Sequence, residues 1–201
     1  HLLRSMVKVE ASVVCYAVAL LLPLALLGGS AAITVLTGAT RPTPAQLAKW
    51  PQIMGNFIFM LLFVGVGEEP GWRGFAIPQL QARFSPVVST MVLAPIWLLW
   101  HAPLFASGEF VLNQLAPFAV TVFGGALALT WLYNRSGGSV LQPMLMHATI
   151  NAVGAGYVFP MFHGVELTRM WWIYAAVWAV AGGIFVVVMR VKRTQGIAVA
   201  S

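Results

Sequence analysis

The sequence predicts an all-α protein: a polytopic bundle of about six transmembrane helices with one short interfacial helix. Hydrophobic residues make up 60% of the chain and charged residues 8%, whereas soluble domains carry about 25% charged residues. Several apolar runs reach the roughly 20 residues that a transmembrane helix needs. The basic residues are scattered or flank these runs, so the net charge of +6 indicates membrane topology rather than nucleic-acid binding. We expect one integral membrane domain over residues 1–201, in contact with the lipid bilayer and without a nucleic-acid partner.

The first half of the chain predicts two spans and the interfacial helix. Span one covers residues 11–36, and a proline-rich loop over residues 37–52 follows it. Span two starts at residue 53 and runs into a pair of glutamates, after which Pro70 and Gly71 should end or kink the helix. The mixed apolar and polar pattern of residues 73–84 predicts a short helix lying along the interface.

The second half of the chain predicts four more spans. Ser85 and Pro86 have the residue types of an N-cap and a first helical position. They open span three, at residues 86–105. Spans four, five and six follow at residues 111–133, 140–159 and 170–189.

The distribution of basic residues predicts the orientation of the bundle. With six spans, both termini lie on one side of the membrane, together with eight of the 11 Lys and Arg residues: Arg4, Lys8, Arg73, Arg83, Arg135, Arg190, Lys192 and Arg193. The other side holds Arg41, Lys49 and Arg169. Because cytoplasmic loops are enriched in Lys and Arg, we predict cytoplasmic termini. The chain begins with His1 rather than Met, so we expect that an N-terminal piece, such as a further span, is absent from it.

Two adjacent carboxylates, Glu68 and Glu69, follow directly on the apolar run of span two. A charged side chain in hydrocarbon costs roughly 2.5–3.5 kcal/mol on insertion scales, so an acid here needs a partner and is a candidate functional residue. Glu69 and Arg73 are four residues apart and can pair on one face if the helix continues. The alternative is that both glutamates mark the solvated end of the span.

Two later spans each carry a histidine that lies four residues, about one helical turn, from an aromatic or an amide side chain. His101 follows Trp97 by four residues, and His147 precedes Asn151 by four residues in the middle of span five. Taken singly, His101 can be interpreted as a residue at the membrane interface. His147 and Asn151 can be interpreted as side chains that form hydrogen bonds between membrane helices. Together with the glutamates on a third span, they are hard to explain as separate accidents of packing. Carboxylate, imidazole and carboxamide groups bind a borderline metal, activate water as a general base and stabilise an oxyanion.

Other patterns exclude several enzyme classes. The sequence has no His-Glu-x-x-His zinc signature, no glycine-rich phosphate loop and no Gly-x-Ser-x-Gly elbow, so a serine or cysteine hydrolase is not indicated. His163 and Glu166 are interpreted as solvated loop residues, and the eight Trp mostly as interfacial belts and packing.

At these residues the chain resembles the CPBP family of intramembrane proteases, the CAAX protease and bacteriocin-processing (Abi) group, which is related to the type II CAAX prenyl endopeptidase. The resemblance covers a core of about residues 60–155. Trp97 stands where the general pattern has Phe, and we interpret it as an aromatic equivalent. The three motifs, in order, are Glu68-Glu69-Pro70-Gly71-Trp72-Arg73, Trp97 to His101, and His147 to Asn151.

The resemblance implies a site for water-dependent peptide hydrolysis. Glu68 and His101 would hold or activate the attacking water, while His147 and Asn151 would complete the polar cage and stabilise the oxyanion. Glu69 and Arg73 would support the site. The family's sites are read both as metal-dependent and as glutamate-based: Glu68, His101, His147 and Asn151 could hold a divalent metal such as Zn, and Glu68 as a general base needs none.

The resulting hypothesis is an intramembrane endopeptidase with an interior, water-accessible cavity near one membrane face, acting on membrane-associated protein or peptide substrates. A bacteriocin-immunity or scaffold protein that binds a partner without catalysis is the alternative. A proton-coupled transporter with Glu68 and His101 as relay groups is a third reading, against which the sequence has no evident internal repeat.

Overall fold

The computed structural model describes residues 2–198, with the side-chain surroundings of residues 2–190. In this part of the chain all regular structure is helical, as the composition predicts. The α-helices are α1 Leu2–Met6, α2 Val13–Leu36, α3 Pro44–Leu47, α4 Gln52–Met60, α5 Val66–Glu69, α6 Ile77–Gln81, α7 Pro86–Trp100, α8 Ala102–Ala106, α9 Leu115–Arg135, α10 Leu141–Val153 and α11 Gly164–Ala198. The π-helical turns are η1 Leu61–Gly65, η2 Pro70–Ala76 and η4 Gly154–Val158, and the 3-10 turns are η3 Leu112–Gln114 and η5 Phe159–Met161.

Five of the described helices are long and apolar enough to cross a membrane: Val13–Leu36, Gln52–Gln81, Pro86–Ala106, Leu112–Arg135 and Gly164–Arg190. The chain is therefore a multi-pass helical membrane protein. Predicted span five is helical, as α10 continued by η4, but it is not among these five. Polar residues in α10, among them Gln142, His147 and Asn151, make it less apolar than the others.

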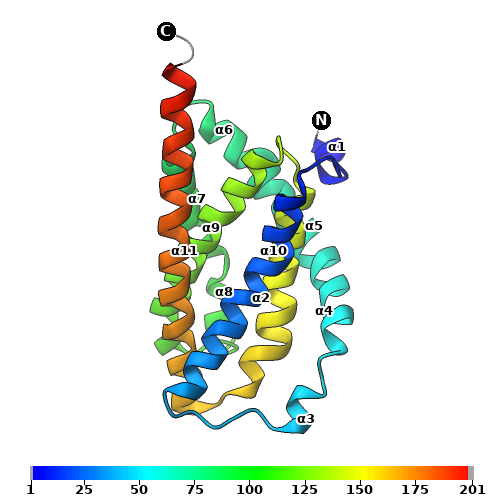
Figure 1. Ribbon diagram of the computed structural model, residues 1–201, viewed down its shortest axis with the longest axis vertical. Coiled ribbons are helices and arrows are strands. Elements are labelled where there is room, and N and C mark those ends of the chain that lie inside the picture. The colour runs from blue at the N-terminus through cyan, green and yellow to red at the C-terminus, as the bar shows by residue number, and fades with distance from the viewer. Residues whose placement is uncertain (1, 199–201) are drawn as a thin grey trace.

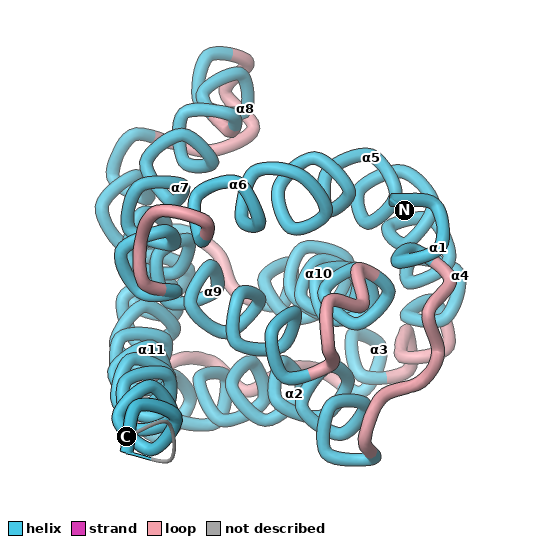
Figure 2. Tube along the Cα trace, turned by 90° about the horizontal axis from the view of Figure 1, so that it is seen from above, coloured by secondary structure: helices cyan, strands magenta, loops and turns pink. Residues whose placement is uncertain are grey.

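The polar helix α10 lies in the middle of the bundle. Figure 2 shows it inside a ring made by α2, α4, α5, α6 and α9, and it packs against α2, α4, η1 and α9. Most of its residues are buried, including Gln142 and His147. Polar side chains at membrane depth are tolerated where protein or a cavity surrounds them rather than lipid. The central position of α10 thus explains how a site can be built on it.

Pro70 and Gly71 were predicted to end or kink the helix; the helix does not end there, because it continues from Gln52 to Gln81 through η1 and η2. Pro70 is the first residue of η2. Proline breaks an α-helix because its ring clashes with the carbonyl four residues earlier and because it lacks an N–H. A wider π turn relieves that clash and often occurs at functional sites. The predicted interfacial helix over 73–84 is instead the last part of this helix, which runs across one end of the bundle toward α7 (Figures 1 and 2).

The predicted start of span three is confirmed. Ser85 has an extended backbone, and its side chain accepts a hydrogen bond from the Val88 N–H over 3.3 Å. Pro86 is the first residue of α7, where its missing N–H leaves no backbone group unsatisfied. This cap fixes the start of α7, four turns before the functional residues at its other end.

Helices α9 and α11 approach each other closely at two glycines. A Cβ atom at Gly124 would lie 2.6 Å from the carbonyl oxygen of Trp178, and one at Gly182 would lie 3.1 Å from the Cα of Gly124. Any larger residue at Gly124 would therefore push the two helices apart. Because α11 is held this close, its aromatic side chains reach the interior of the bundle beside α9.

Helix α1 and the end of α11 lie at the same end of the bundle (Figure 1), as an arrangement with both termini on one side predicts. The connection after α9 is at this end as well, because Lys8 Nζ donates to the Gly137 carbonyl over 2.7 Å and the Val140 N–H donates to the Ser5 carbonyl over 2.9 Å. Which face of the membrane this end meets stays a prediction from the charge distribution.

Single cysteines in η3, just before α9, and near the end of α9 test that orientation. In a Cys15→Ala background, we expect a membrane-impermeant maleimide added to spheroplasts to label Leu112→Cys, since this exposed residue lies at the end away from α1. The exposed Asn134→Cys should be labelled only after the membrane is opened. The reverse pattern would place the termini outside the cytoplasm.

Candidate active site

A buried ion pair between Glu69 and Arg73 forms the inner part of the site. Both side chains are fully buried, and Arg73 Nη1 donates to Glu69 Oε1 over 3.0 Å. His147 Nδ1 donates to the same oxygen over 2.8 Å and so ties α5 to α10. The predicted pairing of Glu69 with Arg73 is confirmed, because the helix continues through η2 and keeps both residues on one face.

This ion pair is not fully satisfied by protein groups. Glu69 Oε2 and the Nε and Nη2 atoms of Arg73 are buried without a hydrogen-bond partner. The guanidinium carbon lies 4.6 Å from the ring centroid of Trp97, and this cation–π contact offsets part of the desolvation cost. Buried polar atoms that lack protein partners are the usual positions of ordered water. We therefore expect water beside Arg73.

Glu68 points to a different neighbour. Its half-buried carboxylate accepts through Oε2 from the indole Nε1 of Trp97 over 2.9 Å and from that of Trp72 over 3.3 Å. No described residue donates a hydrogen bond to its other oxygen, Oε1. The two indoles thus hold the carboxylate by one oxygen and leave the second able to accept a proton.

His101 lies at the C-terminal end of α7, with its ring fixed by the preceding turn. Its Nδ1 lies 2.7 Å from the carbonyl oxygen of Trp97. A carbonyl can only accept, so Nδ1 carries the hydrogen and donates it. The lone pair of the neutral ring is then on Nε2. On its other side the imidazole packs edge-on against Phe118, with ring centroids 5.1 Å apart.

The indole of Trp97 connects the predicted site residues. Besides binding Glu68 and contacting Arg73, its ring centroid lies 5.6 Å from that of His101 and 5.3 Å from that of His147. Glu69 joins this group through Arg73 and His147. The structure therefore brings together five of the six predicted residues, from the helix ending at Gln81, from α7 and from α10.

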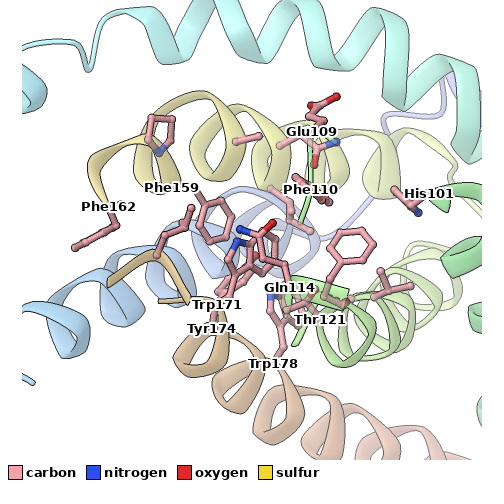
Figure 3. Close-up of a pocket in the computed structure, with 18 of the residues that line it drawn as sticks. His101, Glu109, Phe110, Gln114, Thr121, Phe159, Phe162, Trp171, Tyr174 and Trp178 are labelled. Carbon is pink, nitrogen blue, oxygen red and sulfur yellow. Dashed lines mark hydrogen bonds between the residues drawn. The ribbon is translucent and has the colours of Figure 1, made fainter. Parts of the chain in front are cut away.

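The sixth predicted residue, Asn151, follows His147 by about one turn of α10. It lines the same interior cavity as His101, His147 and Trp97. This cavity has a volume of about 360 Å³ and lies mainly among aromatic side chains of α9, η5 and α11 (Figure 3). Glu68 is not part of its lining, but its carboxylate accepts a hydrogen bond from Trp97, which is.

The cavity opens at the end of the bundle away from α1. Its exposed lining residues include Glu109, which lies between α8 and η3, and His163, which lies just before α11. Figure 1 shows the start of α11 at the end opposite α1. His163 was expected to be a solvated loop residue, and it is exposed at this mouth.

The predicted metal ligands Glu68, His101, His147 and Asn151 include atoms that protein groups engage and atoms that the described residues leave free. Within the described residues, no three His, Cys, Asp or Glu side chains come together as ion ligands. Protein groups engage Glu68 Oε2, His101 Nδ1 and His147 Nδ1, whereas Glu68 Oε1, His101 Nε2 and His147 Nε2 make no hydrogen bond to a described residue. The divalent metal, Zn or another, stays a prediction.

Two features of the site were missed by the sequence analysis. Trp97 was interpreted as equivalent to Phe, but its Nε1–H donates to Glu68, which Phe cannot do. Trp171 and Trp178 were assigned to belts and packing, but they line the cavity together with Tyr174. The donor group of Trp97, four residues before His101, was a signal available in the sequence. No motif marks the residues of α11.

Comparison with known proteins shows which family the chain belongs to. The family model described as type II CAAX prenyl endopeptidase Rce1-like matches residues 50–153, just over half of the chain's 201 residues. The CAAX prenyl protease 2 of Methanococcus maripaludis is 30% identical to this chain over 102 residues, which cover 47% of this chain and 38% of that protein. The chain thus spans well under two thirds of this relative's length. The chain belongs to the Rce1-like family of type II CAAX prenyl endopeptidases.

Proposed function

We propose that this protein is an intramembrane endopeptidase that hydrolyses peptide bonds in membrane-associated protein or peptide substrates. One observation carries the proposal: Glu68, His101 and His147, from three separate helices, converge on the indole of Trp97 beside an interior cavity. The family and the name of the relative point to the same reaction. A membrane-associated substrate follows from the position of the site inside a helical membrane bundle.

In the proposed mechanism, Glu68 is the general base. Its Oε1 takes a proton from a water molecule that lies at the edge of Trp97 and also donates to His101 Nε2. The water oxygen forms a bond to the carbonyl carbon of the substrate, and the carbonyl electron pair moves onto its oxygen. When this intermediate collapses, the C–N bond breaks, and Glu68 returns the proton to the leaving nitrogen. The products are one carboxylic acid and one amine.

His147 and Asn151 are proposed to stabilise the oxyanion. The Asn151 amide makes no hydrogen bond to a described residue, so its N–H groups are available to the substrate. His147 donates Nδ1–H to Glu69, and therefore its Nε2 can donate to the oxyanion when the ring is protonated. Glu69 and Arg73 act as positioning residues, because Glu69 holds the imidazole and Arg73 holds Glu69. Preorganised donors of this kind supply much of the rate enhancement in acyl transfer.

The proposal is tested by cleavage in proteoliposomes. Membrane-anchored peptides of varied sequence are incubated with the wild type and with His101→Gln, and the fragments are identified by mass spectrometry. We expect the wild type to give paired fragments, and His101→Gln to cleave about 10²-fold more slowly, the lower end of the range for a proton-transfer group, because Glu68 still holds the water. Substitution of the exposed Arg83 by Gln, outside the cavity lining, is the control and should leave the rate unchanged.

A different outcome would favour the non-catalytic alternative. If the wild type binds these peptides without cutting any of them, and His101→Gln binds them equally well, then the site serves recognition or packing, as in an immunity or scaffold protein. Thermal unfolding of each variant in detergent separates a lost reaction from a lost fold.

A further inference from the structure

The inner wall of the cavity comes from a helix outside the family match. Trp171, Tyr174 and Trp178 belong to α11, whereas the match to the family model ends at residue 153. A row of ring contacts leads from the site to this wall: His101–Phe118 at 5.1 Å, Phe118–Trp171 at 5.9 Å, Trp171–Phe159 at 4.3 Å, Phe159–Tyr174 at 5.5 Å and Tyr174–Trp178 at 6.1 Å between centroids. The cavity is therefore continuous, along one aromatic wall, with the imidazole of His101.

The hydroxyl of Tyr174 on this wall has a hydrogen to donate and no acceptor for it among the described residues. Tyr174 is 3% exposed and lines the cavity, and no described group accepts the hydrogen of its hydroxyl. Tyrosine hydroxyls usually find a partner when buried, since leaving one unpaired destabilises the protein. Figure 3 shows Tyr174 grouped with Trp171 and Trp178 on the side of the cavity away from Glu109. A ligand with an oxygen acceptor would satisfy this hydroxyl.

The charges around the cavity limit what it can hold. Its lining contains no Lys or Arg, and its carboxylate, Glu109, is exposed at the mouth. Figure 3 shows the Glu109 carboxylate turned away from the group around Tyr174. A carboxylate or an ammonium group placed at the inner wall would lose its hydration without gaining an opposite charge, which is unfavourable. The inner cavity therefore suits an uncharged occupant.

The volume of the cavity is larger than one small side chain needs. About 360 Å³ corresponds to roughly 12 water molecules at about 30 Å³ each, and it falls within the range of about 300–1,000 Å³ for small-molecule sites. A short stretch of extended peptide with one large side chain would fill it.

We propose that the cavity is the subsite for an uncharged substrate segment carrying an aromatic or large aliphatic side chain, with a carbonyl oxygen of that segment accepting from the Tyr174 hydroxyl. This inference rests on the proposed function, because it takes the occupant to be the polypeptide next to the bond that is cut. Selection of the substrate is then set by α11, outside the residues that match the family.

Binding can be measured without turnover in the Glu68→Gln protein. The probes are acetylated, amidated tripeptides, Leu-Phe-Leu, Leu-Asp-Leu and Leu-Lys-Leu, titrated in detergent by calorimetry. We expect Leu-Phe-Leu to bind at least about tenfold more tightly than either charged peptide, since each charge would be buried unpaired. Adding Tyr174→Phe should weaken Leu-Phe-Leu about fivefold, the size of one ordinary hydrogen bond. Tyr133→Phe, on α9 outside the cavity lining, should change nothing.

A variant whose new side chain fills the cavity gives a second, independent test of the subsite. Gly125 lines the cavity, and a Cβ atom there would meet nothing within 4 Å. Gly125→Leu should therefore fold normally and abolish Leu-Phe-Leu binding. Gly28→Leu is the matched control, because Gly28 also has open space but lies exposed on α2.

Equal binding of the three peptides, or undiminished binding by Gly125→Leu, would overturn the subsite. The two proposals fail separately. If binding follows the expected pattern but the wild type never cuts a membrane-anchored version of the Phe peptide, the proposed function fails and the cavity stands as a peptide-binding site without catalysis. If the wild type cuts the Phe, Asp and Lys versions equally well, the subsite fails and the proposed function stands.

Discussion

Glu68→Gln should lower kcat for peptide cleavage by about 10²–10⁴-fold, the contribution typical of a positioned general base. The amide keeps the size of the side chain, and its carbonyl oxygen can still accept from the Trp97 and Trp72 indoles, which lie 2.9 and 3.3 Å from the native carboxylate. It cannot accept a proton from water. The loss is therefore expected in kcat, with little change in stability, as measured by steady-state kinetics in proteoliposomes and thermal unfolding in detergent.

Glu10→Gln is the matched control for this variant. Glu10 is exposed near the N-terminal end of the chain, away from the site, so the same change of charge there should leave kcat as in the wild type. If Glu68→Gln retained wild-type turnover, Glu68 would not be the base, and the water would have to be activated by another group.

Arg73→Met should destabilise the fold by about 3–5 kcal/mol, the usual consequence of leaving one charge of a buried pair alone. Such a loss is a large part of the roughly 5–15 kcal/mol that stabilises a typical protein. Arg73 and Glu69 are both fully buried, 3.0 Å apart. Without Arg73, Glu69 keeps only the hydrogen bond from His147, and its other oxygen already lacks a partner. The readout is the midpoint of thermal unfolding in detergent.

A double variant separates the loss of charge pairing from the loss of packing. Adding Glu69→Gln to Arg73→Met removes the unpaired carboxylate, so the double variant should recover part of the lost stability. Arg83→Met is the control, because Arg83 is exposed and its loss should have little effect. The buried-pair interpretation is wrong if Arg73→Met unfolds at the same temperature as Arg83→Met.

The fold class and the site residues could be predicted because both leave periodic signals. Long apolar runs indicated the helical membrane bundle. Acids and histidines are rare inside such runs, so those of this chain could be recognised as candidate site residues. Helical spacing gave the Glu69–Arg73 pair, which the structure confirms. Which helices face each other is a property of packing, so the hydrogen bond from His147 to Glu69 could not be predicted from spacing.

The errors have physical causes as well. The rule that proline ends a helix assumes α-helical geometry, and Pro70 instead starts a π turn. Interpreting Trp97 by its aromatic ring alone ignored the donor that binds Glu68. The wall provided by Tyr174 and its neighbours on α11 could not be predicted, because aromatic residues of a cavity and of a lipid-facing surface are alike in sequence. Only the packing of α11 against α9 distinguishes them.

Because the helix from Gln52 to Gln81 contains two π turns, the direction in which its glutamates point depends on how many residues each turn holds. Each residue turns an α-helix by about 100°, and a π turn accommodates one more residue than an α-helical turn does. If η1 tightened to α-helix without losing a residue, the extra residue would pass into the next turn and rotate everything after it by about 100°. Glu69 would then no longer face His147, and Glu68 would no longer face Trp97. A gap of one residue at this point in an alignment of related chains would therefore mark an α-helical turn in place of η1, with the direction of the glutamates kept.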